Sequence, residues 1–140
     1  MKYTRQMLIA AALMVMPLLA TAQFGQPVSI STEVPFEFVV GDRVVPAGRC
    51  VLQAANAAAD TILIRNDDKM VRLFSATSLG DARNVPTSNQ LVFHKYGERY
   101  FLAAVRVQGT RLMYWLPESR QETKLRLQDQ SSTEETIHAF

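Results

Sequence analysis

The chain has 140 residues, of which 48% are hydrophobic and 20% are charged. This length is enough for one domain that folds around its own core without disulfide bridges. The 15 Lys and Arg residues exceed the 13 Asp and Glu residues only by the two that stand in an N-terminal leader. The rest of the chain is formally neutral, so it lacks the basic excess of a nucleic-acid-binding protein.

The leader has the three parts of a secretory signal peptide. Lys2 and Arg5 form a positive start, residues 7–20 are an apolar run, and residues 20–22 (Ala-Thr-Ala) are a small-residue cleavage site. The apolar run is shorter than the roughly 20 residues that a membrane-spanning helix needs. We therefore expect cleavage after residue 22 and an exported protein, periplasmic or extracellular, with no membrane span in the mature chain.

The first strands are expected directly after the leader. Residues 28–34 alternate apolar and polar side chains and predict a strand with one solvated face. Pro35 interrupts the pattern, which resumes at residues 36–40. Because proline cannot donate a ladder hydrogen bond, Pro35 marks an edge, a bulge or the bend where the chain passes between sheets. Two turns follow, a two-residue hairpin turn at residues 41–42 and a type I turn at residues 45–48.

A strand at residues 49–54 and a second hairpin come next. In this hairpin residues 61–65 and 70–75 pair around an Asn-Asp-Asp-Lys turn. The side chains expected on its inner face are Ile62, Ile64, Val71 and Leu73. Residues 76–89 have two chain breakers, many small polar residues and no period, which predicts a long surface loop. Such loops often carry function.

The longest strand pair is expected at residues 90–107. Both faces of this hairpin are largely apolar, so it should lie in the middle of a sheet with cover on each side. Gly97 supplies the positive φ of the turn, as either the first or the second of two central residues. In both registers Leu102 and Ala104 share the face of Phe93.

The hairpin continues into a third strand at residues 111–116, which makes a meander. Pro117 suits the first position of a helix, and Glu122 and Arg126 form an i,i+4 pair. We expect a short helix from residue 117 to about 125. The spacing of the leucines near its end also fits a strand.

The domain organisation follows from these elements. Residues 1–22 are expected to be the signal peptide and residues 23–128 a single β domain. Residues 129–140 carry little apolar surface and are expected to be a disordered tail. About eight short strands punctuated by Gly, Pro and Asp turns predict an all-β antiparallel sandwich or barrel, with a short C-terminal helix.

Two stretches resemble a family of small exported acidobacterial proteins of unknown function. They are VPFEFVVGDRVVPAGRC at residues 34–50 and LVFHKYGERYFLAAV at residues 91–105. Family members have a Val-Pro-Phe-x-Phe-x-Val-Gly piece, a Leu-Pro-Ala-Gly-x-Tyr turn and a Leu-x-Phe-x-x-Tyr-Gly-x-x-Tyr-Phe-Leu hairpin. Val45 and Cys50 stand where the family has Leu and an aromatic residue. The resemblance implies an exported, mostly β protein and supplies no catalytic residues.

The residues that could carry catalysis are few. Cys50 is the only cysteine, so it is expected to be a small buried side chain, with intermolecular pairing or reactivity as the alternative. The two histidines, His94 and His138, are too few for a His-rich metal site, and we expect no metal or cofactor. His94 could be an acid or base, but no Ser or Cys nucleophile can be placed beside it. We therefore expect no catalytic residues and no enzyme activity, with a hydrolase at His94 as a remote alternative.

Binding is the expected mode of action. The first hypothesis is a non-enzymatic exported β domain of the cell envelope or extracellular space, acting through an unknown protein partner or an assembly. The alternative is binding of a small ligand or a carbohydrate, because amphipathic rings on a sheet surface suit such recognition. Core packing competes with that role. The residues expected at this surface are Tyr96, Tyr100, Tyr114, Trp115 and His94.

Overall fold

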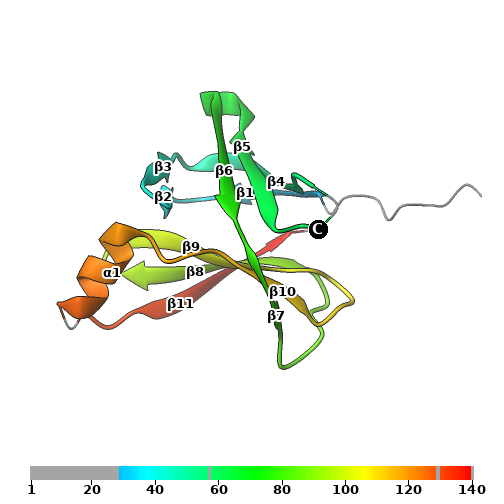
Figure 1. Cartoon of the computed structure of the whole chain (residues 1–140). Helices are drawn as coiled ribbons and strands as arrows, with labels where there is room; N and C mark the ends of the chain where they lie inside the picture. The colour runs from blue at the N-terminus through cyan, green and yellow to red at the C-terminus, as the bar shows by residue number, and fades with distance from the viewer. Residues whose placement is uncertain (1–28, 57, 129, 140) are drawn as a thin grey trace, which may run out of the picture.

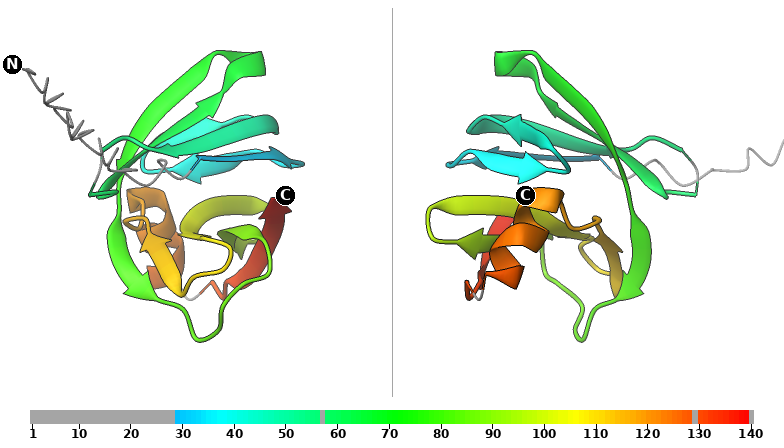
Figure 2. Two further views of the ribbon diagram at one scale, coloured as in Figure 1. Left: turned by 90° about the vertical axis from the view of Figure 1, so that its right-hand side faces the viewer. Right: turned by 60° about the vertical axis from the view of Figure 1, so that its left-hand side comes forward.

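The computed structural model describes residues 29–56, 58–128 and 130–139, so the expected signal peptide lies outside the described residues. Two sheets face each other, with a short helix beside the larger one (Figures 1 and 2). The sequence predicted an all-β sandwich or barrel with a short C-terminal helix. The all-β class and the helix are confirmed, and of the two forms the structure has the sandwich, in which β2 and β9 pair in parallel and the other strand pairs are antiparallel. The described residues form eleven strands rather than about eight.

The smaller sheet has four strands in the order β1-β4-β5-β6. These are β1 (Ser29–Val34), β4 (Gly48–Ala54), β5 (Thr61–Asn66) and β6 (Val71–Ala76). A 3-10 helix, η1 (Asp67–Lys69), joins β5 to β6.

In the larger sheet the order is β11-β8-β9-β10-β7, and β2 pairs with both β3 and β9. Its strands are β2 (Phe38–Val40), β3 (Arg43–Val45), β7 (Ser78–Asp81), β8 (Asn89–Tyr96), β9 (Arg99–Arg106), β10 (Leu112–Trp115) and β11 (Thr133–Ala139). The helix α1 (Arg120–Leu127) follows β10.

The chain passes between the two sheets at three points. Pro35 and Pro46 lie at the first two, so Pro35 is the bend between sheets that was one of its expected roles. At the third, β6 runs into β7 through the single residue Thr77, whose Oγ1 donates to the Ala59 carbonyl at 2.7 Å. At the opposite edge Thr32 Oγ1 donates to the His138 carbonyl at 3.4 Å and ties β1 to β11. The sandwich is therefore joined along both of its long edges.

The core fills the space between the sheets. Phe93 of β8 is fully buried, with its ring edge-on to Phe36 and Phe38 at centroid distances of 5.0 and 5.1 Å. The hairpin of β5 and β6 contributes the side chains expected from the sequence. Ile62, Ile64 and Leu73 are buried, and Val71 packs against them.

The hairpin of β8 and β9 is covered on both faces, as predicted. Tyr96 pairs with Arg99, so Gly97 is the first central residue of the turn and has a φ of +60°. One face packs into the core. The other carries Tyr96 and Phe101, which pack against Leu125 of α1. The helix therefore supplies the cover that the apolar pattern required.

A β-bulge corrects the expected faces of β9. Phe93 pairs with Leu102, whereas Val92 pairs with Ala104, so the register shifts between them. An extra residue in one strand moves all later side chains to the opposite face. Val105, rather than Ala104, therefore joins Leu102 in the core between the sheets.

Two segments expected to be irregular are strands. Residues 78–81 of the expected loop at 76–89 form β7, which pairs with β10 over four positions. In the expected disordered tail, β11 pairs with β8 from Thr133 to Ala139. Backbone hydrogen bonds to a neighbouring strand hold both segments, so their polar composition does not prevent folding.

The helix begins later than the sequence suggested. Its first residue is Arg120 rather than Pro117, because Ser119 is the N-cap and its Oγ accepts from the Glu122 amide at 3.0 Å. Serine followed three residues later by glutamate is a recognised pattern of helix N-termini. The expected pair of Glu122 with Arg126 is also absent, since Arg126 instead binds Glu118 with Nε 2.9 Å from Oε1.

Met70 is expected to be a site of easily relieved backbone strain. It ends η1 in the left-handed region at a φ of +53°, and its side chain is 93% exposed. We expect Met70→Gly to raise the free energy of unfolding by about 0.5–1 kcal/mol, because glycine tolerates this φ and no packing is lost. Urea denaturation would measure the change. Met70→Ala is the control and should leave stability nearly unchanged, and a destabilising Met70→Gly would contradict the expectation.

Candidate functional site

A hollow lies between α1 and the face of the larger sheet that points away from the core. It encloses about 240 Å³. We call it the α1 hollow, and the residues that matter for its chemistry are His94, Tyr96, Trp115, Glu118, Glu122 and Arg126. His94 and Tyr96 are two residues apart on β8 and therefore share one face, opposite Phe93. β8 and the stretch from Trp115 to Arg126, which are distant in sequence, thus meet at this place.

A buried carboxylate forms the floor of the α1 hollow. Glu122 is 4% exposed, and its Oε1 lies 2.6 Å from His94 Nδ1 and accepts from the Tyr96 hydroxyl at 3.3 Å. A buried charge is tolerated only with such partners. An ionised carboxylate only accepts hydrogen bonds, so Nδ1 of His94 carries the proton. The hydrogen bond to Glu122 raises the pKa of His94, and burial raises the pKa of Tyr96.

Trp115 supplies the apolar wall of the hollow. Its side chain comes from β10 and the residue is 40% exposed. The indole lies so close to β7 that a Cβ on Gly80 would stand 2.6 Å from Trp115 Nε1. Glycine at this position therefore makes room for the ring.

The rim of the hollow is charged. Arg126 Nε donates to Glu118 Oε1 at 2.9 Å, and its second nitrogen lies 3.4 Å from Oε2. Both side chains are partly exposed, so this ion pair adds little to stability. It does place a donor and an acceptor beside the apolar ring of Trp115.

The residues expected at one aromatic surface lie on two faces of the sheet. The α1 hollow contains His94, Tyr96 and Trp115. On the opposite face, Tyr100 stacks on Phe36 with a centroid distance of 3.7 Å, and Tyr114 packs against the core. The expected five-residue surface is therefore wrong as a single surface. Sequence reasoning also missed the inward role of Glu122, which the serine-glutamate capping pattern could have located on the first turn of a helix.

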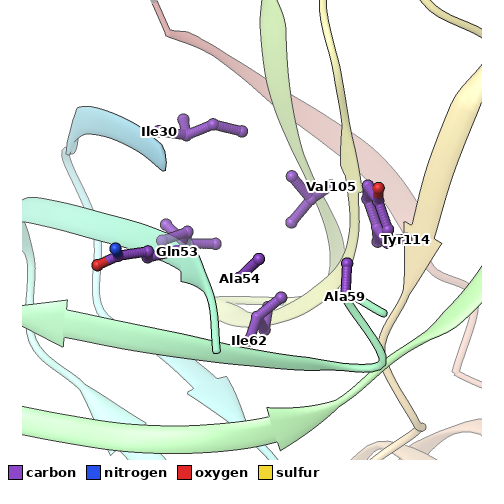
Figure 3. A pocket seen from close by; sticks show the side chains of 8 residues that line it. Ile30, Gln53, Ala54, Ala59, Ile62, Val105 and Tyr114 are labelled. Atoms are coloured by element: carbon purple, nitrogen blue, oxygen red, sulfur yellow. The ribbon is translucent and has the colours of Figure 1, made fainter. Parts of the chain in front are cut away.

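A second cavity opens between the two sheets (Figure 3). Apolar side chains dominate its lining, among them Ile30, Ile62, Val105 and Tyr114, and it encloses about 20 Å³. That is roughly the space of one water molecule. The cavity is too small for a ligand of several atoms, so the α1 hollow is the better candidate of these two.

The remaining chemically reactive groups are buried. Cys50 is fully buried, and burial raises the pKa of its thiol to about 11, so it is not a nucleophile near neutral pH. Ser88 Oγ lies 2.8 Å from His138 Nδ1, but Ser88 is 5% exposed and ties β11 to the segment between β7 and β8 rather than meeting a substrate. In residues 29–56, 58–128 and 130–139, no three His, Cys, Asp or Glu side chains gather in a group that could hold a metal ion.

Comparison of the chain with known protein families, curated proteins and solved structures finds no match. The resemblance to small exported acidobacterial proteins therefore stays a prediction from the sequence. Within the described part of the chain, no helix has the length and apolar character needed to cross a membrane.

Proposed function

We propose that this protein is an exported, non-enzymatic β domain of the cell envelope or extracellular space, and that it binds a saccharide in the α1 hollow. The observation that carries the proposal is the half-exposed indole of Trp115 beside polar and charged groups in one concave site. An aromatic ring offers an apolar platform to a sugar ring, while neighbouring donors and acceptors bind its hydroxyls. The signal-peptide pattern of residues 1–22 supports export.

The hollow favours a small ligand over a protein partner. Its volume of about 240 Å³ is close to the lower end of the roughly 300–1,000 Å³ of small-molecule pockets. Glu118 and Arg126 reach its rim with their charged ends and can exchange their mutual ion pair for bonds to a ligand. A single sugar unit with several hydroxyl groups matches both the volume and this pair of charges.

The absence of a catalytic role is also part of the proposal. The carboxylate of Glu122 already accepts from both His94 and Tyr96. Among the residues that the structure describes, no serine, threonine or cysteine side chain forms a hydrogen bond with His94. A hydrolase would need such a nucleophile or an activated water held in place. The charged cluster therefore fits positioning of α1 better than catalysis.

Trp115→Ala is expected to weaken saccharide binding by about tenfold or more, because the platform is lost. Trp115 is the only tryptophan of the chain, so intrinsic fluorescence of the purified protein reports directly on the hollow. We would titrate it with galactose, glucuronate and short oligosaccharides, and repeat the positive titrations by calorimetry on the variant.

Tyr100→Phe is the matched control, since Tyr100 lies on the other face of the sheet, and it should bind as the wild type does. Binding that survives Trp115→Ala in a folded protein would move the site elsewhere. If no saccharide changes the fluorescence at millimolar concentration, the proposed function is wrong.

A further inference from the structure

The outer edge of β6 is open. β6 is the last strand of the smaller sheet and, among the described residues, pairs with β5 alone (Figure 1). It pairs over six successive positions without a bulge and contains no proline. Alternate backbone N–H and C=O groups of such a strand point away from its one partner and can pair with another chain.

An aromatic side chain stands beside this edge. Phe74 of β6 is 65% exposed on the outer face of the sheet, where it is paired with Leu63 of β5. A single exposed phenylalanine is ordinary on a protein surface. Phe74 differs because it lies on a strand with a free edge. A strand added at β6 would place one of its side chains directly against the Phe74 ring.

The same edge has an uncompensated positive charge. Arg72 lies two residues before Phe74 on the same face and stands directly opposite Arg65. Like charges in this position destabilise a strand pair. Asp67 lies 3.8 Å from Arg65 Nε, a nitrogen that is buried and has no hydrogen-bond partner. In the described part of the chain, no carboxylate lies within 4 Å of Arg72.

We propose that β6 binds an extended acidic segment of a partner protein by strand addition. Side chains of an added strand alternate between the two faces, so partner residues two apart would meet Arg72 and Phe74. The partner segment would carry a carboxylate beside Arg72 and an apolar side chain against Phe74. All strand pairs of the smaller sheet are antiparallel, and a strand added in the same sense meets Phe74 before Arg72. Its recognition pattern is therefore an apolar residue, any residue, then an acidic residue. This surface lies on the smaller sheet and is independent of the α1 hollow.

Charge distinguishes this partner from a second copy of the chain. Pairing β6 with β6 of another copy would bring Arg65 and Arg72 of both molecules to the same face, and these four positive charges would repel one another. An acidic segment instead removes the repulsion between Arg65 and Arg72. Complementary charge at an edge fixes both the choice of partner and its register.

The probe is an acetylated peptide of about strand length, Thr-Thr-Val-Thr-Glu-Thr-Thr, which carries a fluorescein label. Its binding is measured by fluorescence anisotropy. We expect binding at low salt, and at least about a tenfold loss of affinity with Arg72→Glu. Exchanging the peptide Glu for Lys should restore binding to this variant and abolish it with the wild type. Phe74→Ser should also weaken binding. The matched control is Arg43→Glu, an exposed arginine of β3 on the other sheet, which should bind as the wild type does.

Backbone pairing is tested with two N-methylated peptides, one methylated at Glu and Val and one at the threonines that follow them. Only alternate N–H groups of an added strand face β6, so one peptide should lose binding and the other should keep it. Equal affinity of the two peptides would overturn the proposal. A second outcome would also overturn it: the protein binds polygalacturonate but not the peptide, and Arg72→Glu abolishes the binding of polygalacturonate. The arginines would then recognise an acidic glycan. A concentration-dependent dimer in sedimentation that Phe74→Ser abolishes would assign the edge to a second copy.

Discussion

Deletion of residues 130–140 is expected to lower the free energy of unfolding by more than about 3 kcal/mol, or to prevent folding altogether. The deletion removes β11, which pairs with β8 from Thr133 opposite Lys95 to Ala139 opposite Asn89. It also uncovers the core, because Ala139 is 2% exposed. β8 would then become an edge strand with its apolar side chains exposed.

Urea denaturation of the truncated and the intact protein would measure the loss. Two point variants test whether the loss of stability comes from the packing of β11 against the core. Ile137→Ser removes a side chain that packs against the core and is expected to cost about 2 kcal/mol, whereas Thr133→Ser at the exposed start of β11 should cost almost nothing. A truncated protein as stable as the intact one would show that residues 130–140 behave as the disordered tail expected from composition.

β11 escaped prediction from the sequence for a physical reason. Its segment, Thr-Glu-Glu-Thr-Ile-His-Ala, has few apolar side chains, and most of its residues are exposed. The stability of such a strand comes from its backbone hydrogen bonds to β8. The sequence of the segment itself does not indicate those hydrogen bonds. The hairpin of β8 and β9 was predictable because its own apolar residues require cover on both faces.

The bulge between β8 and β9 could not be predicted from the sequence either. The sequence left two registers open, according to whether Gly97 is the first or the second central residue of the turn, and the structure has the first, with Phe93 opposite Leu102. The shift beyond Phe93 depends on how Val105 fits between the sheets, which is a property of the packed core. Alternation within one strand therefore predicts faces only as far as the first irregularity.

The candidate site was partly readable from the sequence. His94, Tyr96 and Trp115 meet in the α1 hollow, but Tyr114 is adjacent to Trp115 on one strand, and neighbours on a strand point to opposite faces. Strand alternation alone could therefore have shown that Tyr114 and Trp115 do not share one surface. The capping pattern could have located Glu122 on the first turn of α1 but not inside the hollow, because the direction of its carboxylate depends on how α1 packs against the sheet.

Glu122→Gln is expected to lower the free energy of unfolding by about 2 kcal/mol near pH 6, with a smaller loss at higher pH. The variant keeps the shape of the side chain but replaces a charge-assisted bond to His94 by a neutral one. The expected loss of stability is only about 2 kcal/mol because the His94 side chain is 34% exposed and solvent weakens its charge pair with Glu122.

The direction of the pH dependence follows from His94. Its pKa is raised in the folded protein by the hydrogen bond to Glu122, above the value of about 6.5 in an unfolded chain. The folded state therefore binds the proton more tightly than the unfolded state. The resulting stabilisation is fully present below about pH 6.5 and is lost as the pH rises through the raised pKa of His94. The difference between the wild type and Glu122→Gln should shrink over the same range.

Denaturation at about pH 6 and about pH 9 would test this, since surface carboxylates are ionised at both values. His94→Gln is the matched variant and should show the same shrinking difference. The double variant should cost less than the sum of the single ones, because both changes remove one interaction. Tyr96→Phe removes only the neutral bond to Glu122 and should cost a similar amount at both pH values. A stability difference for Glu122→Gln that grows with pH would show that the charge of His94 does not help to hold α1 on the sheet.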